Sequence, residues 1–359
     1  MQRAVVLCAA FICCILRCGI AQQPSPAGPD GAQKPELENR QLSQSRLIHL
    51  DAVVTDKSGN PIVGLTQADF TLFDNGRPSP IANFSAIGKD THEAAPPVEA
   101  VLVFDTINLS FQSTADARAE VATFLRQNGG NLPIPVSAIW LTSGGWMEIL
   151  PPSLNGNPLA EQIDPAKSRL RTLQAPSSSY DTLDQIRISV QMMKAIGSFE
   201  ARKPGRKLLL WIGPGWPLFN RPPDDFTNKY QEEFFADITT LSSELRQSRI
   251  AVYSLIRGMP GRGTYQYGSF LKGVKRWQEA LPPYLNLRVL AIQSGGRVMA
   301  PSNDLVPELN DCLRDAGLFY SLTFMPPAAD EPNEYHELQL RVQKPGLVVR
   351  TSSGYYNQP

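Results

Sequence analysis

Oxygen-bearing side chains follow a short apolar run in the middle of the chain. Asp105 comes directly after the run Val-Leu-Val-Phe at 101–104, and Asn108 and Ser110 follow it closely. Carboxylate, amide and hydroxyl oxygens are hard ligands that suit Mg²⁺, but a single carboxylate should hold the ion weakly because Mg²⁺ gives up its waters reluctantly. The alternative is that Asp105 caps a turn or the first helix, a common role of aspartate.

A second group of side chains could contact a partner molecule. Trp146 follows Ser143-Gly144-Gly145 and Trp216 follows Gly213-Pro214-Gly215, so both indoles could lie on an exposed rim, where tryptophan is a frequent anchor. The alternative is that each packs against its own loop. The glycine- and tyrosine-rich segment 257–268 suits either an adaptable contact loop or a disordered one. The candidate partner-binding residues are Thr142, Ser143, Trp146, Trp216, Tyr265 and Tyr267.

Alternating strand and helix patterns in residues 97–316 must position both groups. Apolar runs at 101–104, 136–141, 208–212 and 250–254 indicate buried strands, and apolar stripes at three- and four-residue spacing indicate the helices between them. This order predicts a Rossmann-like α/β domain, with a mostly parallel sheet covered by helices on both faces. Ligands of such sheets bind at the carboxyl ends of the strands, where Asp105, Thr142 and Trp216 are expected.

The flanking segments 46–90 and 317–357 alternate with period two, which is typical of half-buried strands. Asp74-Asn75-Gly76 is a strong hairpin signal because Asn and Gly both tolerate positive φ. Neither segment has enough strands to be stable alone. We therefore expect one small β-sandwich built from both segments, with the α/β domain inserted into it.

The first residues have the features of a secretory signal peptide. An apolar run from Ala4 to Leu16 would span about 20 Å as a helix, which is short of the ~30 Å hydrocarbon core of a bilayer. Gly19-Ile20-Ala21 then supplies small residues for cleavage, so residues 1–21 are the expected signal and the proline-rich segment 22–45 a disordered tether. We expect a secreted, periplasmic or cell-surface protein with no membrane contact after cleavage. Four of the five cysteines lie in the signal, and Cys312 is expected to be a buried small residue.

Charge and histidine content exclude some functions. The chain has 34 Lys and Arg against 34 Asp and Glu, whereas nucleic-acid-binding proteins usually carry a basic excess. Its only three histidines (His49, His92 and His336) are far apart in the sequence, so a histidine-rich metal site is not expected. The basic cluster Arg202-Lys203-Pro204-Gly205-Arg206-Lys207 precedes a strand, and we interpret it as a solvated loop.

The segment from Asp105 to Ser110 resembles the metal-ion-dependent adhesion site of a von Willebrand factor A (VWA) domain, and the chain as a whole resembles the bacterial family of exported VWFA-related proteins. The resemblance covers nearly all of residues 46–357. It rests also on Val53-Val54-Thr55-Asp56, Gly64-Leu65, Asp69-Phe70, Asp74-Asn75-Gly76, Gly205-Arg206-Lys207, Ser294-Gly295-Gly296-Arg297 and Gly354-Tyr355-Tyr356. It implies a Rossmann-like VWA domain that binds proteins through a metal at the top of the sheet and is not an enzyme.

Departures from the adhesion motif predict that any such site is degenerate. Ile107 and Leu109 stand where the motif Asp-x-Ser-x-Ser has its serines, and Gly213-Pro214-Gly215 stands where a later aspartate is expected. Asn108 and Ser110 are one place out of register. The resemblance offers Thr182 as the threonine of the second metal loop. The metal candidates are thus Asp105, Asn108, Ser110 and Thr182, and weak Mg²⁺ is the only cofactor expected.

Two functional classes follow from these residues. The first is an exported, non-catalytic module that binds another protein, of unknown identity, through the top of the sheet. The alternative is a Rossmann-like hydrolase that uses Asp105 and nearby hydroxyls. The hydrolase has no histidine inside the α/β segment and no visible pair of carboxylates for acid–base chemistry, so we favour the binding module.

Overall fold

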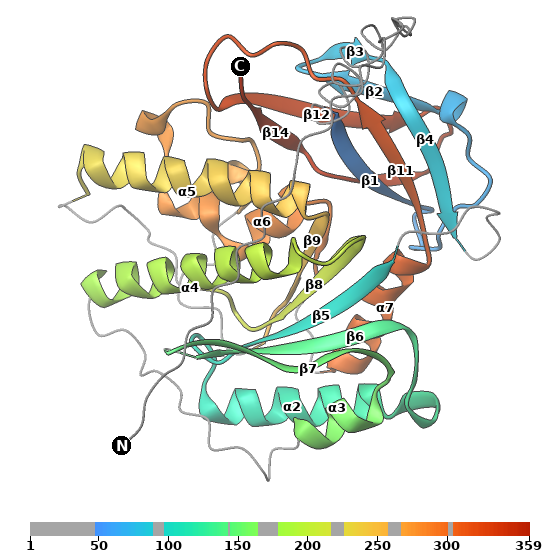
Figure 1. The fold of residues 1–359 in the computed structure, drawn as a ribbon, viewed down its shortest axis with the longest axis vertical. Helices are drawn as coiled ribbons and strands as arrows, with labels where there is room; N and C mark the ends of the chain where they lie inside the picture. Colours follow the sequence, from blue (N-terminus) through green and yellow to red (C-terminus); the bar gives the residue numbers. More distant parts are fainter. Residues whose placement is uncertain are drawn as a thin grey trace, which may run out of the picture. The chain divides into compact units, whose positions relative to one another are not determined.

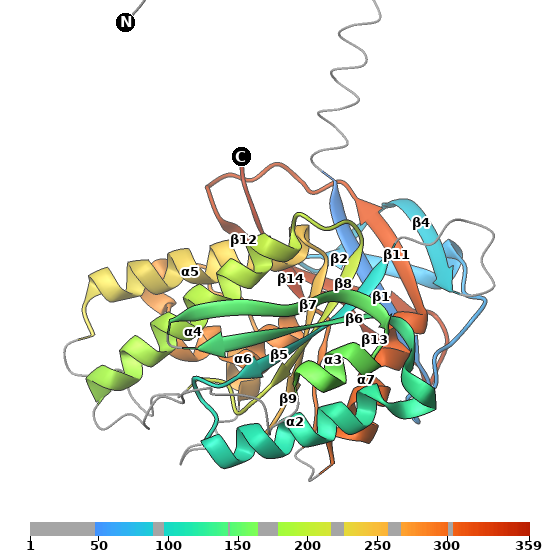
Figure 2. The ribbon, with the colours of Figure 1, turned by 60° about the horizontal axis from the view of Figure 1, so that its bottom comes forward.

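The computed structural model describes residues 47–88, 97–142, 144–163, 179–216, 226–257, 267–300 and 304–359 (Figures 1 and 2). Within these ranges the chain forms three β-sheets. The expected signal peptide (1–21) and tether (22–45) lie outside the described residues. No helix in the described part of the chain is both long and apolar enough to cross a membrane.

The largest sheet has six strands, of which all but one run parallel. In spatial order they are β10 (Arg297–Val298), β9 (Ile250–Leu255), β8 (Arg206–Ile212), β5 (Val98–Asp105), β6 (Asn131–Thr142) and β7 (Gly145–Asn155). The prediction of a mostly parallel sheet is confirmed. The antiparallel edge strand β7 is an addition to it, and Pro151 and Pro152 are tolerated there because an edge strand need not donate every backbone hydrogen bond.

Helices cover both faces of this sheet (Figure 2). One face carries α2 (Phe111–Leu125), α3 (Asn157–Gln162) and α7 (Leu305–Gly317), and the other carries α4 (Ser179–Glu200), α5 (Asn228–Gln247) and α6 (Leu287–Gln293). Short 3₁₀ turns are η1 (Gln67–Asp69), η2 (Gln127–Gly130), η4 (Tyr267–Phe270), η5 (Trp277–Glu279) and η6 (Pro282–Leu285). Neighbouring residues of β5 point to opposite cores, Leu102 to the first and Val101 to the second, which explains the continuous apolar run in its sequence.

Strands from both ends of the chain form two four-stranded antiparallel sheets. The first contains, in spatial order, β13 (Val348–Arg350), β1 (Ile48–Thr55), β11 (Leu318–Phe324) and β4 (Ile81–Gly88). The second contains β14 (Gly354–Asn357), β12 (Glu334–Val342), β2 (Phe70–Asp74) and β3 (Arg77–Ser79). Leu50 and Tyr320 of the first sheet share one apolar core with Leu72 and Leu340 of the second.

The hairpin predicted at Asn75-Gly76 is present between β2 and β3. Asp74 pairs with Arg77 across a two-residue turn in which Asn75 has φ 47° and Gly76 has φ 76°. Positive φ at both positions is the geometry whose twist matches that of antiparallel strands.

The amino ends of the parallel strands face these two smaller sheets (Figure 1). Val98, which begins β5, packs against Val53, Ile87 and Phe319. Because parallel strands share one direction, their carboxyl ends all lie on the side of the six-stranded sheet away from the smaller sheets. Asp105 lies there, and this side is called the carboxyl edge below.

Two predictions about polar side chains have different outcomes. Cys312 is fully buried on α7, as expected, and burial raises the pKa of its thiol. The interpretation of 202–207 as a solvated loop is wrong for its last two residues, because Arg206 and Lys207 are each only 2% exposed. They are the first residues of β8, at the end that the smaller sheets cover, and Arg206 Nη1 donates to the Asp315 carbonyl at 2.7 Å.

Candidate functional site

Asp105 lies at the carboxyl end of β5, between β6 and β8, and is fully buried. Asn108 Nδ2 donates to Oδ1 at 2.9 Å and to Oδ2 at 2.8 Å, and the backbone N–H of Asn108 donates to Oδ1 at 3.2 Å. Trp211 Nε1 on β8 donates to Oδ2 at 3.0 Å. Both carboxylate oxygens are therefore occupied by N–H donors from the same loop and from the neighbouring strand.

Helix α4 orients the amide of Asn108. Gln185 Nε2 donates to Asn108 Oδ1 at 2.6 Å, and Asn108 Nδ2 also lies 3.2 Å from Ser189 Oγ. With its oxygen accepting from Gln185, the Asn108 amide presents its NH₂ group to Asp105. The result is a directed chain of hydrogen bonds from α4 through the loop to the end of β5.

Burial raises the pKa of Asp105, and the hydrogen bonds from Asn108 and Trp211 act in the opposite direction. Such bonds are what make a buried carboxyl group tolerable, since an unpaired one would carry a large desolvation cost. A general base must reach the proton that it abstracts. Asp105 is enclosed and its oxygens already accept hydrogen bonds, so it is a capping acceptor of the turn that follows β5.

The neighbours of Asp105 do not fit a magnesium site. Ile107 and Leu109 are buried apolar side chains with no oxygen to offer. Ser110 is the N-cap of α2, and its hydroxyl accepts from the backbone N–H of Ser113 at 3.0 Å. The described residues contain no group of three His, Cys, Asp or Glu side chains placed to hold a metal ion.

The end of β8 excludes a further carboxylate. A Cβ atom at Gly213 would lie 2.8 Å from Cβ of Asp105, so any side chain there would collide with it. Thr182 lies near the start of α4, but its side chain is outside the described residues. Of the predicted metal set, the structure brings together Asp105 and Asn108, as hydrogen-bond partners, and it supports the alternative that Asp105 caps a turn.

Trp216 does not lie on an exposed rim, which corrects the sequence-based expectation. It is 2% exposed and packs edge-on against Trp211, with ring centroids 5.8 Å apart. Its position after a glycine-rich turn lets the indole fold back over the sheet core. Trp146 is half-buried against Phe199 of α4, with ring centroids 4.8 Å apart. Both tryptophans therefore pack against regular elements of the domain, Trp146 against α4 and Trp216 against β8.

The remaining partner-binding candidates are dispersed. Thr142 is half-buried at the end of β6, and its hydroxyl donates to the Gly145 carbonyl at 3.0 Å inside the β6–β7 turn. Tyr267 begins η4 and is half-buried. Ser143 and Tyr265 lie outside the described residues. The hydroxyl of Thr142 thus stabilises the β6–β7 turn.

Phe111 is a surface residue at this edge that the sequence reasoning missed. It is the first residue of α2, directly after the Ser110 cap, and is 64% exposed. Its spacing to Thr114, Arg118 and Val121, all buried, places it on the buried stripe of the helix. Because it occupies the very end of that helix, the sheet does not cover it. In the sequence, the only indication of this exposure is that Phe111 directly follows Ser110, a residue type that often caps a helix.

These features define a mixed α/β protein with a parallel sheet between two layers of helices and a buried, hydrogen-bonded aspartate at its carboxyl edge. No family model matches the chain, and no curated protein matches it.

Solved structures with some likeness to the chain come from several proteins. The pilus adhesin SpaC from Lactobacillus rhamnosus GG matches with TM-score 0.34 and 11% identity, over 84% of this chain and 48% of SpaC. Human COPII-coat protein Sec24c matches with TM-score 0.33 and 11% identity, over 77% of this chain and 46% of Sec24c. The SpRpn10 VWA domain matches with TM-score 0.26 and 10% identity, over 60% of this chain and 93% of that domain. The chain spans about half the length of SpaC and Sec24c, and similarity at this level does not decide its fold or function.

Proposed function

We propose that this chain is an exported, non-catalytic module with VWA-like architecture that binds another protein without a metal ion. The binding surface is the edge of the parallel sheet at which Asp105 and Phe111 lie. One observation carries the proposal: Asp105 is closed off by Asn108 and Trp211, while Phe111 at the same edge is 64% exposed. A large aromatic side chain in this setting is suited to anchor a partner.

The strand composition supports the finer part of the proposal. Each of the two smaller sheets combines strands from before β5 with strands from after α7, and both contribute to one apolar core. We therefore propose that they form one β-sandwich into which the VWA-like domain is inserted. Export rests on the signal-like pattern of residues 1–21.

The state of Asp105 favours the binding module over the hydrolase alternative. A hydrolase would need Asp105 to act on a substrate or on a water molecule. Asp105 has no exposed surface, and both of its oxygens already accept N–H groups.

A photo-crosslinking residue placed at Phe111 tests the proposed surface. Met325, which is 44% exposed and follows β11, is the matched control. With the full chain expressed in its own exported form, we expect one dominant adduct from position 111, none from position 325, and no effect of EDTA. Equal adducts from both positions would contradict the surface, and loss of the adduct in EDTA would contradict the metal-independent mode.

The variant Phe111→Ser gives the quantitative counterpart. We expect partner capture to fall at least about fivefold, because anchor residues carry most of the binding energy. Removal of an exposed side chain should change the free energy of unfolding by less than about 0.5 kcal/mol. Unchanged capture by a stable Phe111→Ser protein would exclude Phe111 as the anchor.

A further inference from the structure

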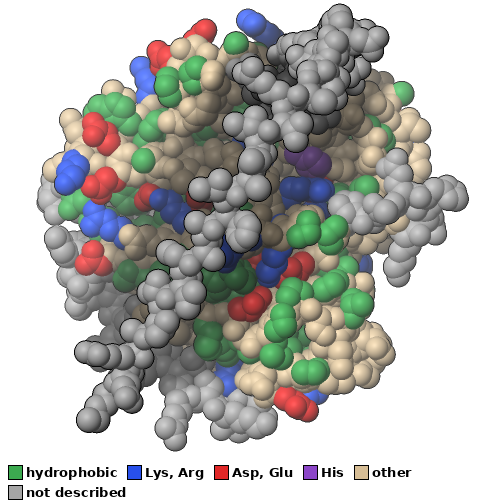
Figure 3. Space-filling model, in the orientation of Figure 1, with side chains coloured by type: hydrophobic (Ala, Val, Ile, Leu, Met, Phe, Trp, Pro, Cys, Tyr) green, Lys and Arg blue, Asp and Glu red, His purple; other side chains and the backbone are tan. Residues whose placement is uncertain are grey.

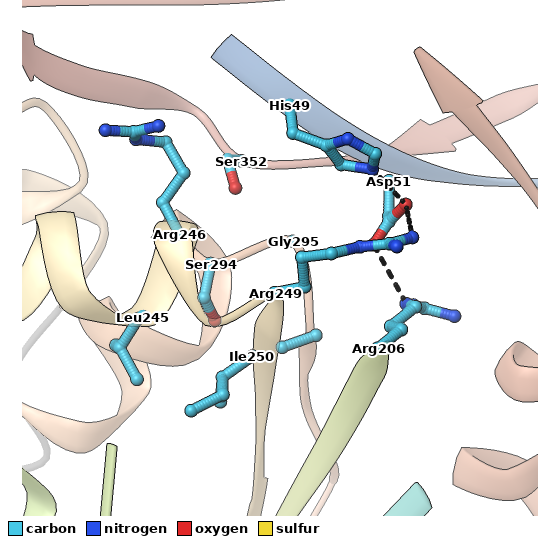
Figure 4. Close-up of a pocket in the computed structure, with 11 residues that line it drawn as sticks. His49, Asp51, Arg206, Leu245, Arg246, Arg249, Ile250, Ser294, Gly295 and Ser352 are labelled. Carbon is cyan, nitrogen blue, oxygen red and sulfur yellow. Dashed lines mark hydrogen bonds and ion pairs between the residues drawn. The ribbon is translucent and has the colours of Figure 1, made fainter. Parts of the chain in front are cut away.

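A polar hollow lies at the amino ends of β8 and β9, beside β1 (Figure 4). Its polar lining residues include His49 and Asp51 from β1, Arg206 from β8, Arg246 from the last turn of α5, Arg249 just after that helix, and Ser352. Figure 3 shows Lys and Arg side chains close to a histidine on this face of the molecule. The enclosed part measures about 20 Å³, which holds one water-sized group.

One carboxylate serves several basic groups in this hollow. Arg249 binds Asp51 through two bonds, Nε to Oδ2 at 3.0 Å and Nη2 to Oδ1 at 2.7 Å, and Arg206 Nε lies 4.0 Å from Oδ2. His49 Nε2 lies 3.2 Å from Oδ1. Burial acts to raise the pKa of Asp51, but the hydrogen bonds from His49 and Arg249 and the charges of both arginines hold it well below its usual range. Asp51 is therefore ionised, and its single negative charge already compensates Arg249 and Arg206.

Arg246 lies outside this ion-pair network. Figure 4 shows its guanidinium directed away from the Asp51 pairs, and no interaction is drawn to it. Within the described part of the chain, its buried Nε has no hydrogen-bond partner. Burial lowers the pKa of Arg246, as expected for a cation that has lost solvent without gaining a carboxylate.

The carboxyl end of α5 does not fully neutralise the positive charge of Arg246. Arg246 lies in the last turn, where the helix dipole offsets about half a unit of positive charge. The residues that line the hollow include three guanidinium groups and one carboxylate, that of Asp51. A net positive charge therefore remains in the hollow.

The hollow continues on the other side of Arg246. A second space of about 20 Å³ adjoins it, with Ser242, Gln293 and Ser352 among its lining residues. Hydroxyl and amide groups can donate hydrogen bonds to an anion. Arg246 and Ser352 line both spaces, so they lie at the centre of a basic and polar surface.

We propose that Arg246, with Ser352 beside it, anchors a binding site for an oxyanion that carries a phosphate or carboxylate group. The enclosed space admits one oxygen of such a group, and the rest of the ligand lies in the open mouth. A guanidinium binds these groups through two parallel N–H bonds. The site lies at the opposite edge of the sheet from Phe111 and is independent of the proposed function.

Calorimetric titration of the full chain with inorganic phosphate, and separately with acetate, at constant ionic strength in chloride tests the site. We expect saturable binding that Arg246→Gln weakens at least tenfold. The matched control is Arg314→Gln, which removes an exposed arginine of α7 and should leave binding unchanged. If phosphate binds and acetate does not, the site is specific for phosphoryl groups. If acetate binds as well, the site also accepts carboxylate groups. Binding of neither anion, or binding that survives Arg246→Gln, would overturn the proposal.

A second variant keeps the test independent of any folding defect in Arg246→Gln. Ser352→Asp places a carboxylate beside Arg246, where the ligand oxygen is expected. The thermal midpoint without phosphate should rise, and phosphate should no longer bind. A Ser352→Asp protein that binds phosphate as the wild type does would contradict the placement of the anion.

Discussion

At the scale of single residues, the state of Asp105 depends on what its oxygens accept. Asn108 and Trp211 donate three side-chain hydrogen bonds to the buried carboxylate. A metal ion would have to displace these donors and would find Ile107, Leu109 and Gly213 where further oxygen ligands are needed. The carboxylate therefore acts as an acceptor that organises the turn between β5 and α2.

We expect Asp105→Ala to lower the free energy of unfolding by about 2 to 4 kcal/mol, because buried donors on Asn108 and Trp211 lose their acceptor. Chemical denaturation would measure the loss, and Mg²⁺ should leave the wild-type midpoint unchanged. Asp116→Ala on the exposed face of α2 is the control and should cost less than about 0.5 kcal/mol. A rise in the wild-type midpoint with Mg²⁺ that Asp105→Ala abolishes would show that Asp105 binds the metal.

At the scale of elements, the turn that begins β8 requires a close approach of two backbones. Gly205 has φ +84°, and a Cβ there would lie 1.9 Å from the Pro97 carbonyl oxygen. That same oxygen accepts the backbone N–H of Arg206 at 2.9 Å. The contact aligns the starts of β5 and β8, so glycine is needed here both for its conformation and for its lack of a side chain.

Gly205→Ala and Gly59→Ala separate these two requirements. Gly59 has φ +85°, but a Cβ there would meet no atom within 4 Å, so alanine should cost only the backbone strain of about 1 to 2 kcal/mol. Gly205→Ala should cost at least about 1 kcal/mol more, because the backbones must also move apart. Urea denaturation of both variants checks the difference. Equal losses would mean that the approach to Pro97 contributes nothing.

At the scale of the whole molecule, Asp51 joins β1 to the parallel-sheet domain. Its main partner, Arg249, follows α5 with φ +55°, a conformation that usually favours glycine. Arginine at this position is explained by its two hydrogen bonds to Asp51. The strain of the backbone is thus offset by an ion pair between segments that are distant in the sequence.

Asp51→Asn should destabilise the protein by about 3 to 5 kcal/mol at pH 7, because Arg206 and Arg249 lose their carboxylate. The folded-state pKa of Asp51 is lowered, so its contribution is present above the unfolded value near 3.9 and is lost as the pH falls toward the folded value. The difference between wild type and variant should therefore shrink below about pH 4. Thermal unfolding from pH 7 to pH 3 measures it, with Asp311→Asn, an exposed pair on α7, as the control. A difference that is constant with pH would exclude the ion pair as its cause.

Elements whose signal lies within a few neighbouring residues could be predicted. The buried strands at 101–104 and 208–212 and the Asn75-Gly76 turn are present as the patterns indicate. The edge strand β7 escaped prediction, since its two prolines suit only an edge position, which local sequence does not reveal. Phe111 escaped because its spacing agrees with the buried stripe of α2.

The sequence by itself determined where the buried strands of the parallel sheet form and that Asp105 ends one of them, because periodicity and turn chemistry act over short distances along the chain. Only the tertiary structure decided what surrounds these residues. Trp211 reaches Asp105 across 106 positions, and Arg249 reaches Asp51 across 198. Burial and hydrogen bonding depend on such distant segments, which is why the expected metal ligand Asp105 is a hydrogen-bond acceptor and why Arg206 and Lys207 are buried.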